Sequence, residues 1–317
     1  MNKDLKLIIQ IPCFNEEKIL SQTLKDLPTS IAGIERIETL VIDDGSSDGT
    51  IRVAKEFGVN HIVRFKKHRG LACAFMAGLN VALEQKANII VNTDADNQYQ
   101  GQDIPKLIRP ILEGEAEMVV GQRDIANIKD FSFVKKQLQK LGSWIVRHVS
   151  GTKVLDATSG FRAYSKEAAL RLNVMSDYTY TLETIIQAGK KDIALAFVPI
   201  GRNKDTRRSR LISSIPSYIM RSVATIVRIY SIYEPLKIFT LIGGILSSVG
   251  LLLGIRFLCF YFAGNGSGHF QSLILAAILL IIGFQIGIIG LVADLVAANR
   301  RLIEENLYRI KKKEIKI

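Results

Sequence analysis

The sequence predicts an α/β domain on a mostly parallel sheet, followed by an interfacial amphipathic helix and a hairpin of two transmembrane helices. Short apolar strand-like segments alternate with helical patterns in the first two thirds of the chain, which is typical of a parallel sheet covered by helices. Two apolar runs in the last third are each long enough to cross a bilayer. The expected divisions are an α/β domain at 1–205, a basic loop and interfacial helix at 206–234, two membrane helices within 235–299, and a basic tail at 300–317.

The charge of the chain predicts a membrane surface as a partner. The formal net charge is +12, and residues 201–317 supply +10 of it because 16 basic residues there stand against 6 acidic ones. Basic residues beside long apolar runs indicate an anionic lipid surface and argue against nucleic acid as a partner. The three cysteines show no CxxC pair and the four histidines no metal-ligand spacing, which excludes a disulfide-rich secreted protein and a zinc hydrolase. The chain runs from Met1 directly into a strand-like segment, so we expect no signal peptide.

The two apolar runs predict membrane helices at about 236–263 and 270–296. The first run contains Lys237 and Arg256, and the second has no charged residue between 270 and 293. A buried helix of a soluble protein would give the same pattern, but two such runs in tandem favour a membrane hairpin. Basic residues flank both ends of the hairpin, so the positive-inside rule predicts that the α/β domain and the tail are cytoplasmic. We therefore expect a multi-pass protein of the plasma or inner membrane.

The segment at 211–233 predicts an amphipathic helix in the membrane interface. Its apolar residues recur every three or four positions, and Arg221 and Arg228 fall on another face. An ordinary helix packed on the α/β domain would show the same pattern, and this alternative stays open.

The α/β domain is expected to bind its ligand beyond the carboxyl ends of its strands. The strand-like segments are 5–11, 39–42, 61–65, 88–92, 118–121 and 194–198, with helical patterns at 16–27, 48–57, 70–85 and 103–112.

Acidic residues follow two of these strands. Asp43 and Asp44 end the second strand, and Asp94 and Asp96 follow the fourth. Adjacent carboxylates repel each other unless a cation or a donor lies between them, and Mg²⁺ and Mn²⁺ prefer such oxygen ligands together with substrate phosphates. A polar turn or a helix cap is the simpler structural interpretation of each motif taken alone. Neither GxxxxGK[ST] nor GxGxxG follows a strand, which removes the kinase-like and dehydrogenase-like interpretations.

Five motifs in order give the sequence a specific resemblance. They are Pro12-x-Phe14-Asn15-Glu16, Asp43-Asp44-Gly45-Ser46-x-Asp48, Asp94-x-Asp96-x-Gln98, Gly121-x-Arg123 and Ser159-Gly160-Phe161-Arg162. Over about residues 5–235 the chain resembles family 2 glycosyltransferases, and within them the dolichyl/polyprenyl-phosphate glycosyltransferase branch, including dolichyl-phosphate mannosyltransferase-like enzymes.

The resemblance implies a GT-A fold, a nucleotide-diphospho-sugar donor, a polyprenyl phosphate acceptor, and Mg²⁺ or Mn²⁺ as cofactor. The residues that it implies for the nucleotide are Pro12, Phe14, Glu16, Asp43 and Asp94; for the metal, Asp94, Asp96 and Gln98; for catalysis, Asp96, Arg123, Asp156 and Arg162; and for the acceptor phosphate, Arg207, Ser209 and Arg210. The two arginines of the catalytic set would pair with phosphate groups. Asp156 would orient Arg162 or the acceptor, or it is a loop carboxylate paired with a neighbouring base. For Glu183 a position behind the site and a helix-surface position both stay open.

The expected reaction is transfer of a hexosyl group from a UDP- or GDP-sugar to the lipid phosphate, with inversion at the anomeric carbon. Two alternatives stay open: a family 2 enzyme acting on a sugar or glycan acceptor, and a membrane-tethered sensor of nucleotide sugars without catalysis. Association with further copies of the chain is also open. The sequence gives no preference for a particular sugar or base.

Overall fold

The structure is a computed structural model of the whole chain, in which residues 5–123, 142–148, 150–175, 179–203, 234–264 and 268–315 are described, together with Met220, Ala224, Arg228, Ser231 and Tyr233. The chain divides into two compact units, one of residues 1–226 with 307–317 and one of residues 227–306. The predicted interfacial helix at 211–233 lies almost entirely outside the described residues.

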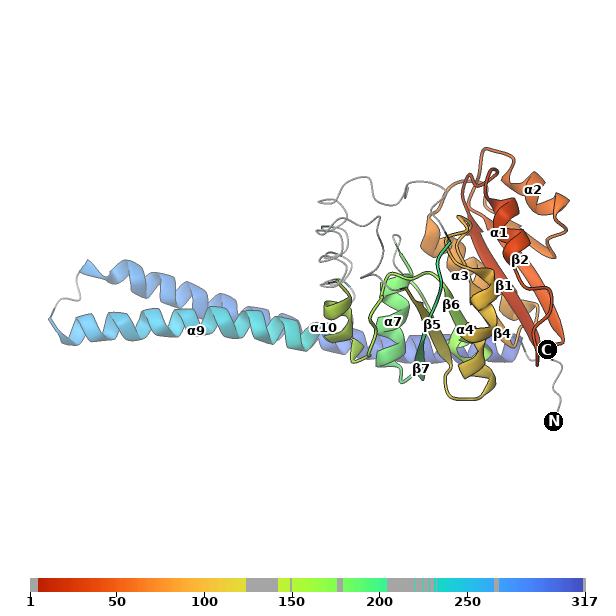
Figure 1. Cartoon of the computed structure of the whole chain (residues 1–317). Helices are drawn as coiled ribbons and strands as arrows, with labels where there is room; N and C mark the ends of the chain where they lie inside the picture. The colour runs from red at the N-terminus through yellow and green to blue at the C-terminus, as the bar shows by residue number, and fades with distance from the viewer. Residues whose placement is uncertain are drawn as a thin grey trace. The chain divides into compact units, whose positions relative to one another are not determined.

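A seven-stranded sheet forms the centre of the first unit, in the order β3-β2-β1-β4-β6-β5-β7 (Figure 1). The strands are β1 (Lys6–Cys13), β2 (Arg36–Asp43), β3 (His61–Arg64), β4 (Ile89–Asn92), β5 (Met118–Gln122), β6 (Arg162–Ser165) and β7 (Leu195–Pro199). All neighbouring pairs are parallel except those made by β6, which runs antiparallel to both β4 and β5. The carboxyl ends of the six other strands therefore lie along one edge.

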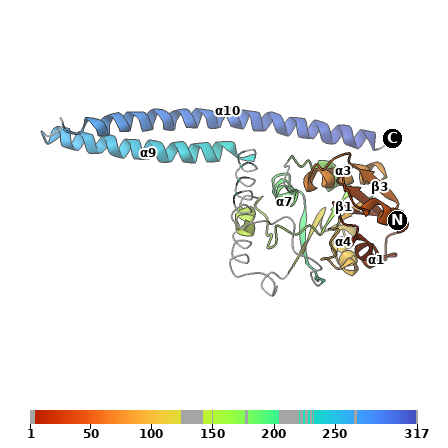
Figure 2. The same ribbon diagram turned by 90° about the horizontal axis from the view of Figure 1, so that it is seen from above.

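Helices cover both faces of this sheet, so the central strands are apolar on both sides. β1 is buried at every position after its first, and its side chains at Leu7, Ile9 and Ile11 belong to one core cluster. In Figure 2, α3 and α7 lie on one face of the sheet and α1 and α4 on the other. The helices are α1 (Leu20–Asp26), α2 (Thr50–Glu56), α3 (Leu71–Glu84), α4 (Ile104–Leu112), α6 (Lys166–Arg171) and α7 (Thr181–Lys190), with a 3-10 turn, η1 (Gly101–Asp103).

The second unit contains the helix α9 (Pro235–Phe262) and most of α10 (Phe270–Glu314), whose residues from Leu307 onward belong to the first unit. Both are long and apolar enough to cross a membrane. Their buried residues recur every seven positions, at Gly243, Gly250 and Phe257 on α9 and at Ala276, Gly283, Gly290 and Ala297 on α10. This period is that of a left-handed pair of helices, here with small residues at most contacts. α10 continues to Glu314, through the segment expected to form the tail.

These observations confirm the predicted fold class: a mostly parallel sheet followed by two long apolar helices. The predicted strands all occur, and the structure adds β6, which is not among the predicted strands.

Candidate active site

The carboxyl ends of the parallel strands bring the predicted site residues to one edge of the sheet. They are Pro12, Phe14 and Glu16 at the end of β1, Asp43 at the end of β2, Asp94, Asp96 and Gln98 after β4, and Arg123 after β5. Phe14 is exposed, whereas Glu16 and Asp43 are buried. The site is therefore an acidic edge with an aromatic ring at its rim.

The loops after β1 and β2 are joined by short hydrogen bonds. The backbone N–H of Asn15 donates to the Ser46 hydroxyl at 2.9 Å, and the Asn15 side-chain oxygen accepts from the Ser47 N–H at 2.9 Å. The Glu16 N–H donates to the Thr50 hydroxyl at 2.8 Å. Asn15 adopts φ 55°, a left-handed conformation that asparagine tolerates better than most residues. The motif at 12–16 and the motif at 43–48 are thus held side by side at the edge of the sheet.

Asp94 lies at the centre of the charged residues. Burial, reinforced by the charge of Asp96, raises the pKa of Asp94 to about 7, although the charges of Arg123 and Arg162 act in the opposite direction. The chain passes close to this carboxylate, because a Cβ atom at Gly160 would lie 2.8 and 2.9 Å from its two oxygens. A cation bound between Asp94 and Asp96 would offset the repulsion of their carboxylates and stabilise the ionised form of Asp94.

The segment that carries Asp96 and Gln98 is held by hydrogen bonds within the segment and by hydrogen bonds from Asn203 to its backbone carbonyls. Asp96 Oδ1 accepts from the Gln98 N–H at 3.2 Å, while Asn203 donates its N–H to the Gln98 carbonyl at 3.0 Å and its side-chain amide to the Asn97 carbonyl at 3.1 Å. Within the residues that the structure describes, no group of three or more His, Cys, Asp and Glu side chains could hold a metal ion. Two carboxylates and an amide oxygen are nevertheless a normal protein contribution to Mg²⁺, which takes its other ligands from water and substrate phosphates.

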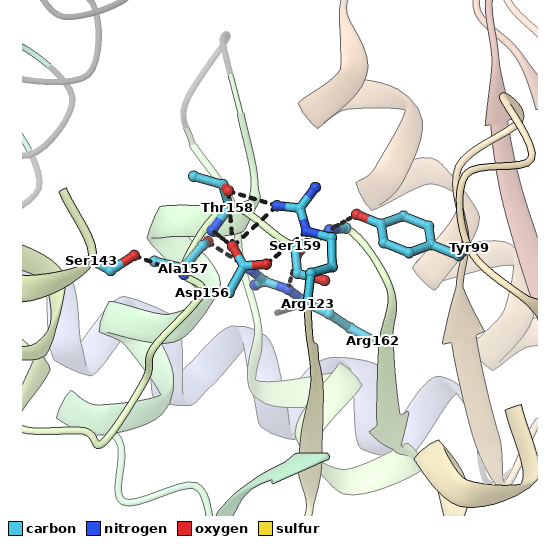
Figure 3. Close-up of polar contacts among 9 residues, drawn as sticks. Tyr99, Arg123, Ser143, Asp156, Ala157, Thr158, Ser159 and Arg162 are labelled. Atoms are coloured by element: carbon cyan, nitrogen blue, oxygen red, sulfur yellow. Dashed lines mark hydrogen bonds and ion pairs between the residues drawn. The ribbon is translucent and has the colours of Figure 1, made fainter. Parts of the chain in front are cut away.

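Arg123 and Asp156 form a buried ion pair next to this set (Figure 3). The Arg123 Nε and Nη2 atoms donate to the two Asp156 oxygens at 2.7 and 3.1 Å, and Nη2 also donates to the Thr158 hydroxyl at 2.9 Å. Burial alone would raise the pKa of Asp156, but the charge and hydrogen bonds of Arg123 bring it below its usual value. Pairing with a neighbouring base is one of the roles considered for Asp156, and the structure shows such a pair with Arg123.

Arg162 has a different environment from the one that the sequence suggests. Its side chain is fully buried on β6. Its guanidinium donates to four protein acceptors: Ser159 O at 2.7 Å, Thr181 O at 2.8 Å, Thr184 Oγ1 at 2.5 Å and Ala157 O at 3.0 Å. A buried guanidinium with these partners has no exposed surface for a phosphate. The geometry therefore favours a structural role over the expected phosphate contact.

Sequence reasoning did not find a buried network below Asp94. The Asn92 side-chain amide donates to the Tyr180 hydroxyl at 2.8 Å and to the Gly160 carbonyl at 2.9 Å, and the Gly160 N–H donates to the Tyr99 hydroxyl at 2.9 Å. The Tyr180 ring stacks on Phe75 with centroids 3.9 Å apart. Aromatic residues usually indicate packing, so no signal in the sequence distinguishes these two tyrosines from the other seven.

Glu183 is buried on α7 and accepts from the Met175 N–H at 3.1 and 3.2 Å, so it is not a surface carboxylate. The predicted acceptor residues Arg207, Ser209 and Arg210 lie outside the described residues.

Comparisons with known proteins agree with this geometry. The family model described as "Glycosyl transferase family 2" matches residues 8–172. UDP-N-acetylglucosamine–dolichyl-phosphate N-acetylglucosaminyltransferase of Methanococcus voltae is 33% identical over 222 residues, which cover 62% of this chain and 85% of the relative. Dodecaprenyl-phosphate galacturonate synthase of Rhizobium johnstonii is 24% identical over 312 residues, covering 93% and 88%. Glucosyl-3-phosphoglycerate synthase of Mycobacterium tuberculosis, solved with Mn²⁺, UDP-glucose and phosphoglyceric acid, aligns with a TM-score of 0.58 at 20% identity, covering 72% of this chain and 80% of that one.

The sheet order and the structural neighbour show a GT-A-like fold, and the family match makes the chain a glycosyltransferase. The chain belongs to glycosyl transferase family 2. Curated relatives within that family act on polyprenyl phosphates.

Proposed function

We propose that the protein transfers a hexosyl group from a UDP- or GDP-sugar to a polyprenyl phosphate at the cytoplasmic face of a membrane. The observation that carries the proposal is the meeting of Asp94, Asp96 and Arg123 at one edge of the sheet, in a chain whose other unit is a pair of apolar helices. Relatives that are named for dolichyl and dodecaprenyl phosphates support the acceptor.

A divalent cation fits the acidic residues of this edge. Asp94, Asp96 and Gln98 would hold Mg²⁺ or Mn²⁺, because burial and the charge of Asp96 raise the pKa of Asp94 to about 7 and a cation would favour its ionised form. The chemistry that such an ion supplies is neutralisation of the negative charge on the departing nucleoside diphosphate. A structural neighbour solved with Mn²⁺ and UDP-glucose supports this choice.

The reaction requires little acid–base chemistry from the protein. An oxygen of the acceptor phosphate forms a bond to the anomeric carbon while the bond from that carbon to the diphosphate oxygen breaks, and the nucleoside diphosphate leaves with the electron pair. A phosphate monoester is already ionised at pH 7, so it needs positioning rather than deprotonation. An in-line displacement of this kind inverts the anomeric centre.

Arg123 is the described cation best placed for a phosphate group. Its guanidinium side chain is 12% exposed and is oriented by Asp156 and Thr158, so it is fixed before any ligand arrives. A preorganised guanidinium matches phosphate geometry in a bidentate way. Arg162 would position the loop at 157–159 through its bonds to the Ser159 and Ala157 carbonyls. The contacts of Arg207, Ser209 and Arg210 with the lipid phosphate remain part of the proposal.

The hairpin would anchor the enzyme where its acceptor is found. Lys237 and Arg256 on α9 are 19 positions apart in the sequence, which corresponds to about 28 Å of helix, close to the thickness of a bilayer core. Arg256 would then lie at the far interface, where its side chain reaches the headgroups. Basic flanks such as Lys311 to Lys313 favour the cytoplasm for both ends of the hairpin.

The test is a transfer assay with undecaprenyl phosphate, Mg²⁺ or Mn²⁺, and a panel of UDP- and GDP-sugars, followed by mass spectrometry of the lipid. The wild-type chain and the surface control Glu113→Gln are expected to add one hexose-type unit. Asp96→Asn is expected to lower the rate about 10²-fold or more with an unchanged melting temperature. Elongation of free oligosaccharides instead of the lipid would support the glycan-acceptor alternative. Nucleotide binding without turnover on any acceptor would support a sensor.

A further inference from the structure

The segment at 64–70, named here the β3–α3 loop, lies beside the nucleotide edge of the sheet and is not among the predicted site residues. It connects β3 to α3 and has the sequence Arg-Phe-Lys-Lys-His-Arg-Gly, with all of its Lys, His and Arg side chains exposed. Arg64 lies at the carboxyl end of β3, and its Nε is 3.5 Å from Asp43 Oδ2. Four Arg and Lys side chains beside a site for an anionic nucleotide favour the charge of a diphosphate.

Asp44 holds this loop in place. Its carboxylate is 3% exposed and accepts from the Arg69 N–H at 2.7 Å and the Gly70 N–H at 2.9 Å. His68 Nδ1 lies 2.9 Å from Asp44 Oδ2. The backbone at Gly45 lies close to the same loop, because a Cβ atom there would be 2.6 Å from the Lys67 carbonyl carbon. The φ of +75° at Gly45 also disfavours any other residue. The contacts with Asp44 and the close approach of Gly45 therefore fix the position of His68.

The imidazole of His68 stacks on the ring of Phe14, with centroids 4.1 Å apart and planes 29° from parallel. The His68 side chain is 55% exposed although Asp44 fixes one of its nitrogens. The contact with Asp44 uses Nδ1, and no described residue is recorded against Nε2 or the second face of the ring, which we expect to receive the ligand. Phe14 is itself 37% exposed and is the residue expected to line the nucleotide.

We propose that His68 and Phe14 form a two-ring platform for the nucleobase of the donor, with Asp44 as the residue that positions His68. This inference rests on the proposed function for the donor class, a nucleoside diphosphate sugar. Flat heteroaromatic bases stack on exposed rings, and the imidazole presents such a face next to Asp44, directly after the end of β2. Asp44 then acts indirectly: it orients the ring and does not contact the nucleotide.

The test measures binding of UDP and of GDP to the full-length protein in detergent by calorimetry, without any acceptor. His68→Ala is expected to weaken the preferred nucleotide about tenfold, within the range found for single base–aromatic stacks, and Asp44→Asn to weaken it severalfold. His68→Phe keeps the stacking face and is expected to restore most of the affinity. The matched control is His61→Ala, because His61 also pairs with a carboxylate, Glu38 at 2.7 Å, but at the other end of β3.

The outcomes separate this inference from the proposed function. Unchanged affinity in His68→Ala overturns the platform even if sugar transfer is observed. Tighter binding in that variant also overturns it, since the imidazole would then occupy the place of the base. Weaker binding in His68→Ala, with rescue by His68→Phe, supports the platform even if no polyprenyl phosphate is glycosylated. If the wild-type chain binds neither nucleotide, both proposals fail.

Discussion

The buried pair of Arg123 and Asp156 gives a quantitative prediction for Asp156→Asn. The side chains of the pair are 12% and 1% exposed, and they share two hydrogen bonds. Removing one partner of a buried ion pair costs about 3–5 kcal/mol, because the other charge stays buried without compensation. Asparagine keeps the shape and one acceptor oxygen, so the expected loss is about 3 kcal/mol, at the lower end of this range.

The loss is measured as a shift in melting temperature. A unit of the size of the first one loses about 2–4 °C for each kcal/mol, so Asp156→Asn is expected to melt about 6–12 °C below the wild-type chain. Glu113→Gln is the matched control, because it makes the same chemical change in an exposed ion pair with Arg109. Such a pair contributes about 0.3–0.5 kcal/mol, so the control is expected to shift by about 2 °C or less.

The pH dependence gives the same prediction an independent check. The folded pKa of Asp156 lies below its unfolded value, so the stabilisation is complete above the unfolded pKa of about 4 and is lost as the pH falls through the folded pKa. The difference between the wild-type chain and Asp156→Asn is therefore expected to shrink below pH 4. A loss under about 1 kcal/mol at pH 7, or a difference that does not depend on pH, would refute the picture of a desolvated pair.

Three further predictions concern residues around Asp94. Burial and Asp96 raise the folded pKa of Asp94 from 3.8 to about 7, so the metal-free protein is expected to lose stability as the pH rises from about 4 through 7. Mn²⁺ is expected to raise the melting temperature more at pH 8 than at pH 6. Equal Mn²⁺ shifts at both pH values would count against the site. Gly160→Ala would place a Cβ atom 2.8 Å from the Asp94 carboxylate and is expected to abolish transfer, whereas Gly142→Ala, with no atom within 4 Å of its Cβ, is expected to keep it. Arg162→Lys is expected to lower stability by about 3 kcal/mol in chemical denaturation, since an ammonium replaces a planar guanidinium in a closed site, and a wild-type midpoint would contradict the structural role.

The sequence predicted the parts of the fold that depend on local pattern. Strands such as β1 are continuous apolar runs and could be found from composition, and each acidic motif follows such a run. Parallel pairing then places the ends of separate strands on one edge, so Asp43 and Asp94 could be expected near each other. Strand β6, from Arg162 to Ser165, reads Arg-Ala-Tyr-Ser, which is not an apolar run and gives no comparable signal.

The side-chain partners could not be predicted in the same way. Arg123 and Arg162 follow similar motifs, yet one is fixed at the site by Asp156 and the other is enclosed by backbone carbonyls. This difference depends on the partners that the fold brings to each side chain, because Arg162 begins β6 whereas Arg123 follows the end of β5. His68 was missed for a related reason. Its partners Phe14 and Asp44 lie on other strand ends, and only the folded sheet brings the three together.

The packing of α9 on α10 depends on individual glycines, and neighbouring residues of α9 provide a sharp comparison. A Cβ atom at Gly243 would lie 2.6 Å from the Gly283 carbonyl oxygen, well inside ordinary contact, whereas one at Gly244 would meet no atom within 4 Å. Gly243→Ala must therefore separate the helices or bend them, at a cost of about 1–3 kcal/mol. Gly244→Ala changes the composition and hydropathy of the helix identically and is expected to be neutral or slightly stabilising, because alanine is the better helix former.

Spin labels in place of Leu241 on α9 and Phe284 on α10, both of which are exposed, allow the distance between the helices to be measured in detergent. The distance between the labels is expected to increase or broaden in Gly243→Ala and to match the parent protein in Gly244→Ala. Equal distance distributions in the two variants would mean that the helices do not pack through Gly243 and Gly283. Since hydropathy cannot distinguish two adjacent glycines, only a specific helix contact predicts different outcomes for them. The hairpin would then be a defined packing unit as well as an apolar anchor.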